Sequence, residues 1–368
     1  CNITSLQDIW NSEGMRQLRN NMLINQPSKS CSRCYEREKF GFVSKRQASN
    51  QHHGHRIPII EETKTDGSLD RFEMRYWDIR FSNLCNLRCR SCGPSFSSSW
   101  YQDQLQLAPD YKDHHKAMIF AGKYETDLWE QLIDHIDHVE QVYFAGGEPL
   151  LMEEHYRILE ELVRRGRTEV RLIYNTNFTH TDLKGRSVFE YWKKFDSVSV
   201  GASLDDSGAR GEYIRKGTDW GVVENNLKTF RDLDGVIFQI NTVFSIFNYY
   251  TITEFYDYLI GKDIIRQDDW HHTLYLTVNP SYYSATSLPK TLKQLSADKS
   301  HNWIAKHKAR YPVIAQLLTG AIQFAANADT WCNNKEQFFQ HILSTDRIRK
   351  ESFFNVFPEL NKFPVWTE

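Results

Sequence analysis

The stretch Tyr76-Trp-Asp-Ile-Arg-Phe-Ser-Asn-Leu-Cys85-Asn-Leu-Arg-Cys-Arg-Ser-Cys92 carries three closely spaced cysteines directly after the strand-like run Met74–Phe81. Three thiolates this close can hold three corners of an iron–sulfur cube, and no fourth protein ligand follows nearby. One iron would then be free to take a small molecule, so the C-x3-C-x2-C spacing predicts a reactive cluster. The physical alternative is a zinc knuckle, although zinc usually takes four ligands in paired sets.

From residue 72 onward, strand-like and helix-like segments alternate. The strands expected are Met74–Phe81, Gln141–Ala145, Val170–Asn175, Ser197–Ser203, Val236–Phe244 and His272–Val278. The helices expected between them are Thr126–Glu140, Glu153–Arg165, Trp220–Leu233 and Ile252–Ile260. Such repeats imply parallel strands joined by right-handed crossovers, two repeats short of a full barrel. We therefore expect the α/β class, a partial (β/α)6 TIM-like barrel, with its site at the C-terminal strand ends where the cysteines lie.

A second motif, Tyr143-Phe-Ala-Gly-Gly-Glu-Pro-Leu150, closes the next expected strand. Adjacent glycines let the backbone approach a ligand closely, and an acidic side chain beside them can pair with an ammonium group. By itself this pattern is also that of an ordinary tight turn. Its position at the strand end after the cysteine loop favours a ligand site.

The two motifs together resemble those of the radical SAM superfamily. The resemblance implies that Cys85, Cys89 and Cys92 hold a [4Fe–4S] cluster. It also implies that Gly146, Gly147 and Glu148 hold the methionine amino group of S-adenosylmethionine. Further strand-end positions resemble the family's cofactor-binding positions: Asn175, Asn177, Ser203, Asp205 and Arg215. Arg215 resembles the arginine that pairs with the cofactor carboxylate. Ser91 departs from the pattern, because many members carry an aromatic residue there.

The N-terminal segment resembles the twitch module, a shortened SPASM module. It combines a helical pattern over Leu6–Leu23, interrupted by Gly14, with a Cys31-Ser-Arg-Cys34 pair. The resemblance implies an auxiliary [4Fe–4S] cluster held by Cys1, Cys31, Cys34 and Cys332. Four thiolates suit zinc equally well, and the resemblance favours iron–sulfur.

Three regions are expected. Residues 1–56 together with about 325–368 would form the auxiliary-cluster module, 70–280 the barrel, and 281–324 a helical connection. The apolar run Val313–Ala326 predicts a helix, and the aromatic, basic stretch Phe338–Phe357 predicts a helical tail that packs back on the barrel. No chemistry is assigned there apart from Cys332.

Composition narrows the class of protein. The 368 residues are 40% hydrophobic and 25% charged, which is ordinary for a globular chain and excludes disorder. Forty-five basic and 47 acidic side chains argue against broad nucleic-acid binding. No apolar run approaches the roughly 20 residues that span a bilayer. Seven clustered cysteines fit a reducing cytoplasm. The start at Cys1 instead of Met predicts a trimmed form of a longer protein.

The resemblance implies reductive cleavage of S-adenosylmethionine to a 5′-deoxyadenosyl radical. That radical would take a hydrogen atom from an unactivated carbon of a peptide or small molecule. The partners implied are this substrate and an electron donor such as flavodoxin or ferredoxin, with no membrane. One alternative is a radical isomerase acting on a hypermodified nucleobase or nucleotide, as in phage-type DNA modification. Another is a zinc–thiolate binding module without catalysis.

Overall fold

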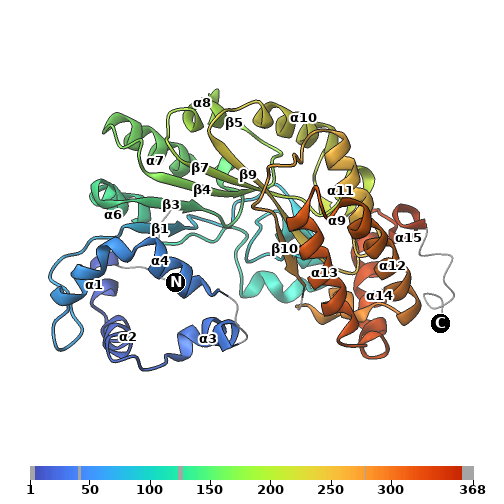
Figure 1. Cartoon of the computed structure of the whole chain (residues 1–368), viewed down its shortest axis with the longest axis horizontal. Coiled ribbons are helices and arrows are strands. Elements are labelled where there is room, and N and C mark those ends of the chain that lie inside the picture. The colour runs from blue at the N-terminus through green and yellow to red at the C-terminus, as the bar shows by residue number, and fades with distance from the viewer. Residues whose placement is uncertain (1–4, 40–42, 123–126, 278, 359–368) are drawn as a thin grey trace. The chain divides into compact units, whose positions relative to one another are not determined.

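The computed structural model describes residues 5–39, 43–122, 127–277 and 279–358 (Figure 1). It divides into two compact units. The first comprises the chain up to Met74 together with Ala121–His138, and the second comprises Arg75–Phe120 and the chain from Val139 onward. The second unit contains both motifs, and therefore the candidate site.

A six-stranded parallel sheet forms the centre of the second unit. Its strands, in spatial order, are β1 (Tyr76–Ile79), β3 (Gln141–Phe144), β4 (Arg171–Thr176), β7 (Val198–Ser203), β9 (Val236–Phe244) and β10 (Thr273–Leu276). All five neighbouring pairs are parallel. The expected partial barrel is confirmed, and each expected strand matches within two residues at either end. Two short antiparallel pairs lie outside this sheet, β2 (Arg88–Cys89) with β8 (Arg215–Lys216) and β5 (Asp182–Leu183) with β6 (Arg186–Ser187).

Helices of the crossovers cover one face of the sheet (Figure 1). They are α7 (Glu153–Arg164), α8 (Val188–Trp192), α9 (Gly208–Ile214), α10 (Trp220–Arg231) and α11 (Ile252–Gly261). In β4, alternate residues are buried, which sends Leu172 and Tyr174 toward these helices. Tyr174 stacks on Phe144 and makes an edge-to-face contact with Trp192. An aromatic core therefore lies between the sheet and these helices.

The opposite face of the sheet is its inner face, and the sheet is curled around it. Tyr143 lies on β3 and Tyr275 on β10, two strands that are separated by three others in the sheet order. Burial raises the pKa of Tyr143 to about 12, and Tyr275 adds to that shift. Tyr275 is half exposed.

Helix α5 (Trp100–Leu107), which precedes β3, and the helices after β10 complete the second unit. α5 follows the cysteine loop, and the C-terminal set is α12 (Lys290–His307), α13 (Pro312–Ala326), α14 (Trp331–Arg349) and α15 (Phe353–Val356). α14 and α15 pack through aromatic rings: Phe353 contacts both Phe338 of α14 and Tyr213 of α9. The tail therefore packs on the barrel unit.

The first unit consists of short helices. They are α1 (Leu6–Trp10), α2 (Glu13–Leu23), α3 (Ser32–Lys39), α4 (Lys45–His52), the 3-10 helix η2 (Gly54–Glu62) and α6 (Asp127–Ile133). No residue of α1, α2, α4 or η2 is buried. Apolar side chains on these elements are exposed instead, among them Leu23 of α2 and Ile57 of η2. Of the helix expected at Thr126–Glu140, α6 covers Asp127–Ile133 and a 3-10 turn covers Ile136–His138, and Thr126 lies outside the described residues.

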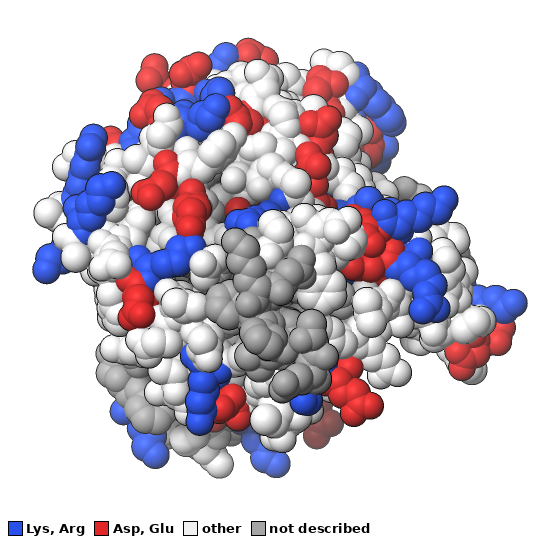
Figure 2. Space-filling view, turned by 90° about the vertical axis from the view of Figure 1, so that its right-hand side faces the viewer, with Lys and Arg blue, Asp and Glu red and all other residues white. Residues whose placement is uncertain are grey.

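The described surface carries mixed charge. On the face shown in Figure 2, lysines and arginines alternate with aspartates and glutamates outside the grey residues. Among the described residues, we find no helix with the length and hydropathy of a membrane span.

Candidate active site

The cysteine loop is held by backbone contacts as well as by its own turn. β2 pairs with β8, which sets Cys89 directly opposite Arg215. The Ser99 hydroxyl donates to the Cys85 carbonyl at 2.7 Å, and the Trp100 indole donates to the Cys89 carbonyl at 2.8 Å. The start of α5 therefore fixes the positions of the first two cysteines.

The three thiols of the loop lie in an apolar setting. Burial raises the pKa of Cys85 to about 11 and that of Cys89 to about 12, and it raises the pKa of Cys92 as well. Such thiols are poor free nucleophiles at neutral pH, and a bound metal is what would deprotonate them. The donor set therefore fits a metal–thiolate centre better than a catalytic free cysteine.

A single zinc ion and an iron–sulfur cluster take thiolate ligands in different ways. In the part of the chain that the structure describes, no three His, Cys, Asp or Glu side chains converge to hold one metal ion. A tetrahedral zinc site needs its thiolates within about 2.3 Å of one point. A cube takes its thiolate ligands at separate corners, so three cysteines can hold three of its corners.

The Gly-Gly-Glu turn packs directly against the cysteine loop. Gly146 and Gly147 have φ of +78° and +42°, a left-handed backbone that favours glycine. A Cβ on Gly147 would lie 2.3 Å from the Leu84 carbonyl oxygen, and the Glu148 amide donates to that same oxygen at 2.7 Å. The structure thus brings the two motifs together, one residue before Cys85.

The Glu148 side chain points into the protein. Its carboxylate accepts hydrogen bonds from the Thr176 hydroxyl at 2.7 Å, the Asn177 amide at 2.8 Å and the Leu150 amide at 3.2 Å. It is 2% exposed, and burial raises its pKa to about 7. The carboxylate therefore links the ends of β3 and β4, and the part of this turn left for a ligand is its backbone.

Arg215 links the cysteine loop to the end of β7. Its Nε lies 2.8 Å from an Asp205 carboxylate oxygen, and its Nη1 donates to the Cys89 sulfur at 3.8 Å. Asp205 is fully buried and also accepts from the Val243 amide. Hydrogen bonds to a thiolate are among the contacts that tune a cluster. Both residues expected near the cofactor therefore lie beside the loop.

Asn177 also joins this group. Its side chain donates to Asn86 of the cysteine loop at 3.1 Å and accepts from Thr179. Ser203 lies at the end of β7, opposite Asn241 in the strand register.

Asn175 lies two residues before Asn177, on β4, and belongs to a different hydrogen-bond network. A row of hydrogen-bonded side chains crosses the inner face: Gln239 donates to Asn241, Asn241 to Asn175, and Asn175 to the Tyr143 hydroxyl, at 3.2, 2.7 and 2.5 Å. The row passes over Gly201, where a Cβ would lie 2.1 Å from the Asn241 amide nitrogen. We call these four polar side chains the amide row.

The expected auxiliary ligands are placed separately. Cys31 ends a 3-10 turn (η1, Lys29–Cys31) and Cys34 lies in α3, one helical turn on, and both are half-buried. Cys332 is exposed at the start of α14. Cys1 lies outside the described residues. The four-cysteine site stays a prediction.

Comparison with known families agrees with this geometry. The model of the Radical SAM superfamily matches residues 79–259, which run from β1 through α11 and include both motifs. Residues 79–259 form a radical SAM domain. Members of that superfamily are iron–sulfur enzymes that use S-adenosylmethionine. No curated protein matches the sequence.

Several solved structures resemble the chain at low identity. A structure titled native anSMEcpe with bound AdoMet and Cp18Cys peptide is 17% identical, covering 64% of this chain and 60% of its own, with a TM-score of 0.42. A histidine-tagged anSMEcpe with bound AdoMet is 19% identical, with coverages of 65% and 62% and a TM-score of 0.45. Streptococcus suis SuiB bound to S-adenosylmethionine is 17% identical, with coverages of 69% and 50% and a TM-score of 0.38. The chain thus spans about 60% of the anSMEcpe structures and half of SuiB.

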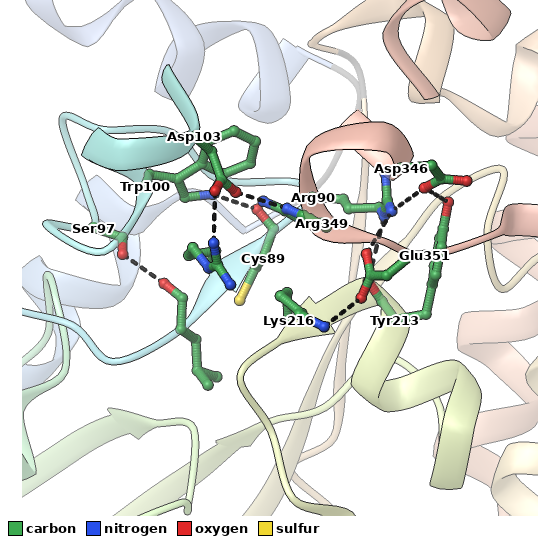
Figure 3. Close-up of polar contacts among 12 residues, drawn as sticks. Cys89, Arg90, Ser97, Trp100, Asp103, Tyr213, Lys216, Asp346, Arg349 and Glu351 are labelled. Atoms are coloured by element: carbon green, nitrogen blue, oxygen red, sulfur yellow. Dashed lines mark hydrogen bonds and ion pairs between the residues drawn. The ribbon is translucent and has the colours of Figure 1, made fainter. Parts of the chain in front are cut away.

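The cysteine loop has a second set of partners, which extends beyond the family-matched region to the C-terminal helices. Asp103 of α5 accepts from Arg88 at 2.6 Å and from Arg349 of α14 at 2.8 Å (Figure 3). We call Arg88, Asp103 and Arg349 the arginine triad. The Arg349 guanidinium also lies over the Trp100 ring, 4.5 Å from its centroid.

Arg90, next to Cys89, forms another buried group. It donates to Asp346 at 2.5 Å and to Glu351 at 2.9 Å, and Glu351 also pairs with Lys216 at 3.0 Å. Figure 3 shows this group around Arg90, with Trp100 and Asp103 on the opposite side of the view. We call it the Arg90 group. Sequence reasoning missed both groups, because their pairs with the C-terminal residues Asp346, Arg349 and Glu351 include separations of 246 to 261 positions and no local motif marks them.

Proposed function

We propose that the protein reductively cleaves S-adenosylmethionine and uses the resulting radical to abstract a hydrogen atom from an unactivated carbon. The observation that supports this most is the contact between the cysteine loop and the left-handed Gly-Gly turn, made through Leu84. When bound at Cys85, Cys89 and Cys92, a [4Fe–4S] cluster supplies the electron that breaks the carbon–sulfur bond to give methionine and a 5′-deoxyadenosyl radical.

The chain's own residues would position the cofactor. The backbone carbonyls at Gly146 and Gly147 are the groups left to accept from its ammonium, because the Glu148 carboxylate is engaged elsewhere. Arg215 is a cation beside the loop that could meet a carboxylate, and Asp205 holds it in place. Asn177 ties the end of β4 to the loop and keeps both on one side of the sheet.

The inner face of the sheet is the surface that we assign to the substrate. It lies below the strand ends and presents the amide row, whose donors and acceptors are uncharged. Arg80 and Asp78, at the end of β1, form an ion pair whose two charges compensate each other. A neutral substrate with amide-type groups fits this lining. A peptide amide and a nucleobase edge both have that chemistry, so substrate assays need to include both.

An auxiliary cluster in the first unit is the second part of the proposal. Cys31 and Cys34 are one helical turn apart, and none of the surrounding helices α1, α2 and α4 buries a residue. Helices that bury no residue of their own gain little from packing, and metal binding can supply folding free energy to such segments. A cluster closed by four thiolates has no open corner, so its task would be to pass an electron, whose source would be a donor such as flavodoxin or ferredoxin.

The test is release of 5′-deoxyadenosine. Anaerobic, reconstituted protein given dithionite and S-adenosylmethionine should release it, and Cys89→Ala protein should not. Ser91→Ala, a change at an exposed position in the same loop, is the matched control and should retain the reaction. Equal product from the Cys89→Ala and unchanged proteins would reject the assigned site.

A further inference from the structure

The arginine triad differs from the other ion groups at the cysteine loop in its net charge. Arg215 is balanced by Asp205, and in the Arg90 group two cations face two carboxylates. In the triad, Arg88 and Arg349 share the single carboxylate of Asp103. Of the three groups that contact the loop, this one keeps an uncompensated positive charge.

Two of the three side chains of the triad are shielded from water. The Asp103 side chain is 1% exposed and the Arg349 side chain is fully buried, whereas Arg88 is about a third exposed. Both Nη atoms of Arg349 lack a hydrogen-bond partner among the described residues. A buried charge acts over a longer range than an exposed one, because solvent and salt screen it less.

The triad reaches Cys89 by two routes. Arg88 precedes Cys89 in the chain, and Arg349 covers the ring of Trp100, whose indole donates to the Cys89 carbonyl. Trp100 itself is 3% exposed. A substitution in the triad would therefore change the electrostatic potential at Cys89. It would also move Trp100, which donates a hydrogen bond to the Cys89 carbonyl.

We propose that Asp103 and Arg349 are positioning residues for the cluster at Cys85, Cys89 and Cys92, and that the triad's net positive charge raises the reduction potential of that cluster. The inference rests on the proposed function, since it requires the cluster. One-electron reduction adds one negative charge to the cluster and moves no proton. A nearby buried cation favours the reduced form, and net charge is among the main determinants of iron–sulfur potentials. The C-terminal helix α14 thus contributes to chemistry that lies outside it.

Two substitutions separate charge from structure. Arg349→Met removes a positive charge and leaves Asp103 with Arg88 alone, so the potential should fall. Asp103→Asn is isosteric and removes the negative charge, so the potential should rise. Both break the same ion pair, so a purely structural role would move both proteins in the same direction.

The measurement is a mediated redox titration of reconstituted protein followed by electron paramagnetic resonance. The relevant cluster is identified by the change of its signal when S-adenosylmethionine is added. We expect at least a threefold change in the reduction equilibrium for each variant, which is about 28 mV for a one-electron couple. Arg349→Lys keeps the charge and should restore most of the potential. Arg347→Met removes an exposed charge from the same helix and should shift it less.

Shifts of the same sign, or shifts no larger than that of Arg347→Met, would overturn the proposal. Denaturation of the apo-proteins and iron content per chain show which variants keep the fold and the cluster. If Arg349→Met does not fold, Asp103→Asn and Arg349→Lys still test the sign. An unchanged protein without a reducible cluster would defeat the proposed function, whereas a normal cluster with unshifted potentials would defeat only the role of the triad.

Discussion

Gly147 combines two constraints in one residue. Its backbone is left-handed, and its missing Cβ makes room for the Leu84 carbonyl oxygen. Gly166, after α7, is also left-handed, at φ +69°, but has open space where its Cβ would be. The two glycines therefore separate the cost of backbone strain from the cost of close approach.

We expect Gly147→Ala to destabilise the protein by about 3 kcal/mol, the sum of left-handed strain and a steric clash. Gly166→Ala should cost only about 1 kcal/mol. Chemical denaturation of both variants checks the difference. Gly147→Ala should also weaken binding of S-adenosylmethionine, as measured by calorimetry. Equal destabilisation of the two variants would show that the cysteine loop around Leu84 shifts to make room for the methyl group added at position 147.

His155 predicts a dependence of stability on pH. It is fully buried on α7, its Nε2 lies 3.0 Å from the Tyr174 hydroxyl, and burial lowers its pKa to about 3. In the unfolded chain the His155 imidazole binds a proton below its ordinary pKa of 6.5. In the folded chain it does so only when the pH falls to about 3. This contribution to stability is therefore complete above pH 6.5 and is lost as the pH falls through that window.

At pH 4 the loss should be about 3 kcal/mol relative to pH 7. His155→Gln keeps a partner for Tyr174 but does not titrate, so its free energy of unfolding should fall less between pH 7 and 4. His114→Gln, an exposed position, is the control and should behave as the unchanged protein. Parallel curves for the His155→Gln and unchanged proteins would contradict the assignment.

At the scale of elements, the amide row depends on a strand position that carries no side chain. A Cβ at Gly201 would collide with the Asn241 amide, so Gly201→Ala should break the row and cost about 2 kcal/mol. Gly320→Ala, in an exposed turn of α13, should instead stabilise by up to about 1 kcal/mol. Denaturation curves test both signs. A neutral Gly201→Ala protein would mean that the row rearranges.

The strands were predictable because burial alternates or persists along them, as in Val236–Phe244, whose bounds match the structure. The first helix was less predictable from the sequence. One helix was expected over Leu6–Leu23, broken at Gly14, but α1 ends at Trp10 and α2 begins at Glu13. Asn11 exchanges two hydrogen bonds with the backbone of Leu69, which draws it out of the helix. A partner 58 residues away leaves no local pattern.

At the scale of the whole molecule, the two proposed clusters can be counted. Replacing both Cys31 and Cys34 by Ser should lower iron per chain by about half if both centres are four-iron cubes. Cleavage of S-adenosylmethionine at the first site should persist to a measurable degree, because Cys85, Cys89 and Cys92 lie in the other unit. Ser30→Ala, beside Cys31, is the control. Unchanged iron in the double variant would remove the auxiliary cluster.

The candidate site could be predicted from sequence as far as its ligands are local. The cysteine loop and the Gly-Gly turn are short motifs, and parallel strand order places them together, as the contact at Leu84 shows. Arg349 and Asp346 are ordinary charged residues on a helix with no motif. Arg349 pairs with Asp103 and Asp346 pairs with Arg90, each more than 240 residues earlier in the chain. Only the tertiary structure brings these residues into contact.

Those long-range ion pairs also have a consequence for biosynthesis. A ribosome makes the cysteine loop early and makes Arg349 and Glu351 some 260 residues later. Until α14 has emerged and docked, Arg90 and Asp103 lack these counter-ions, so the loop cannot reach its final packing. The nascent chain therefore passes through a long interval in which the three thiols are present but not yet enclosed, and that interval is open to the machinery that delivers iron and sulfide.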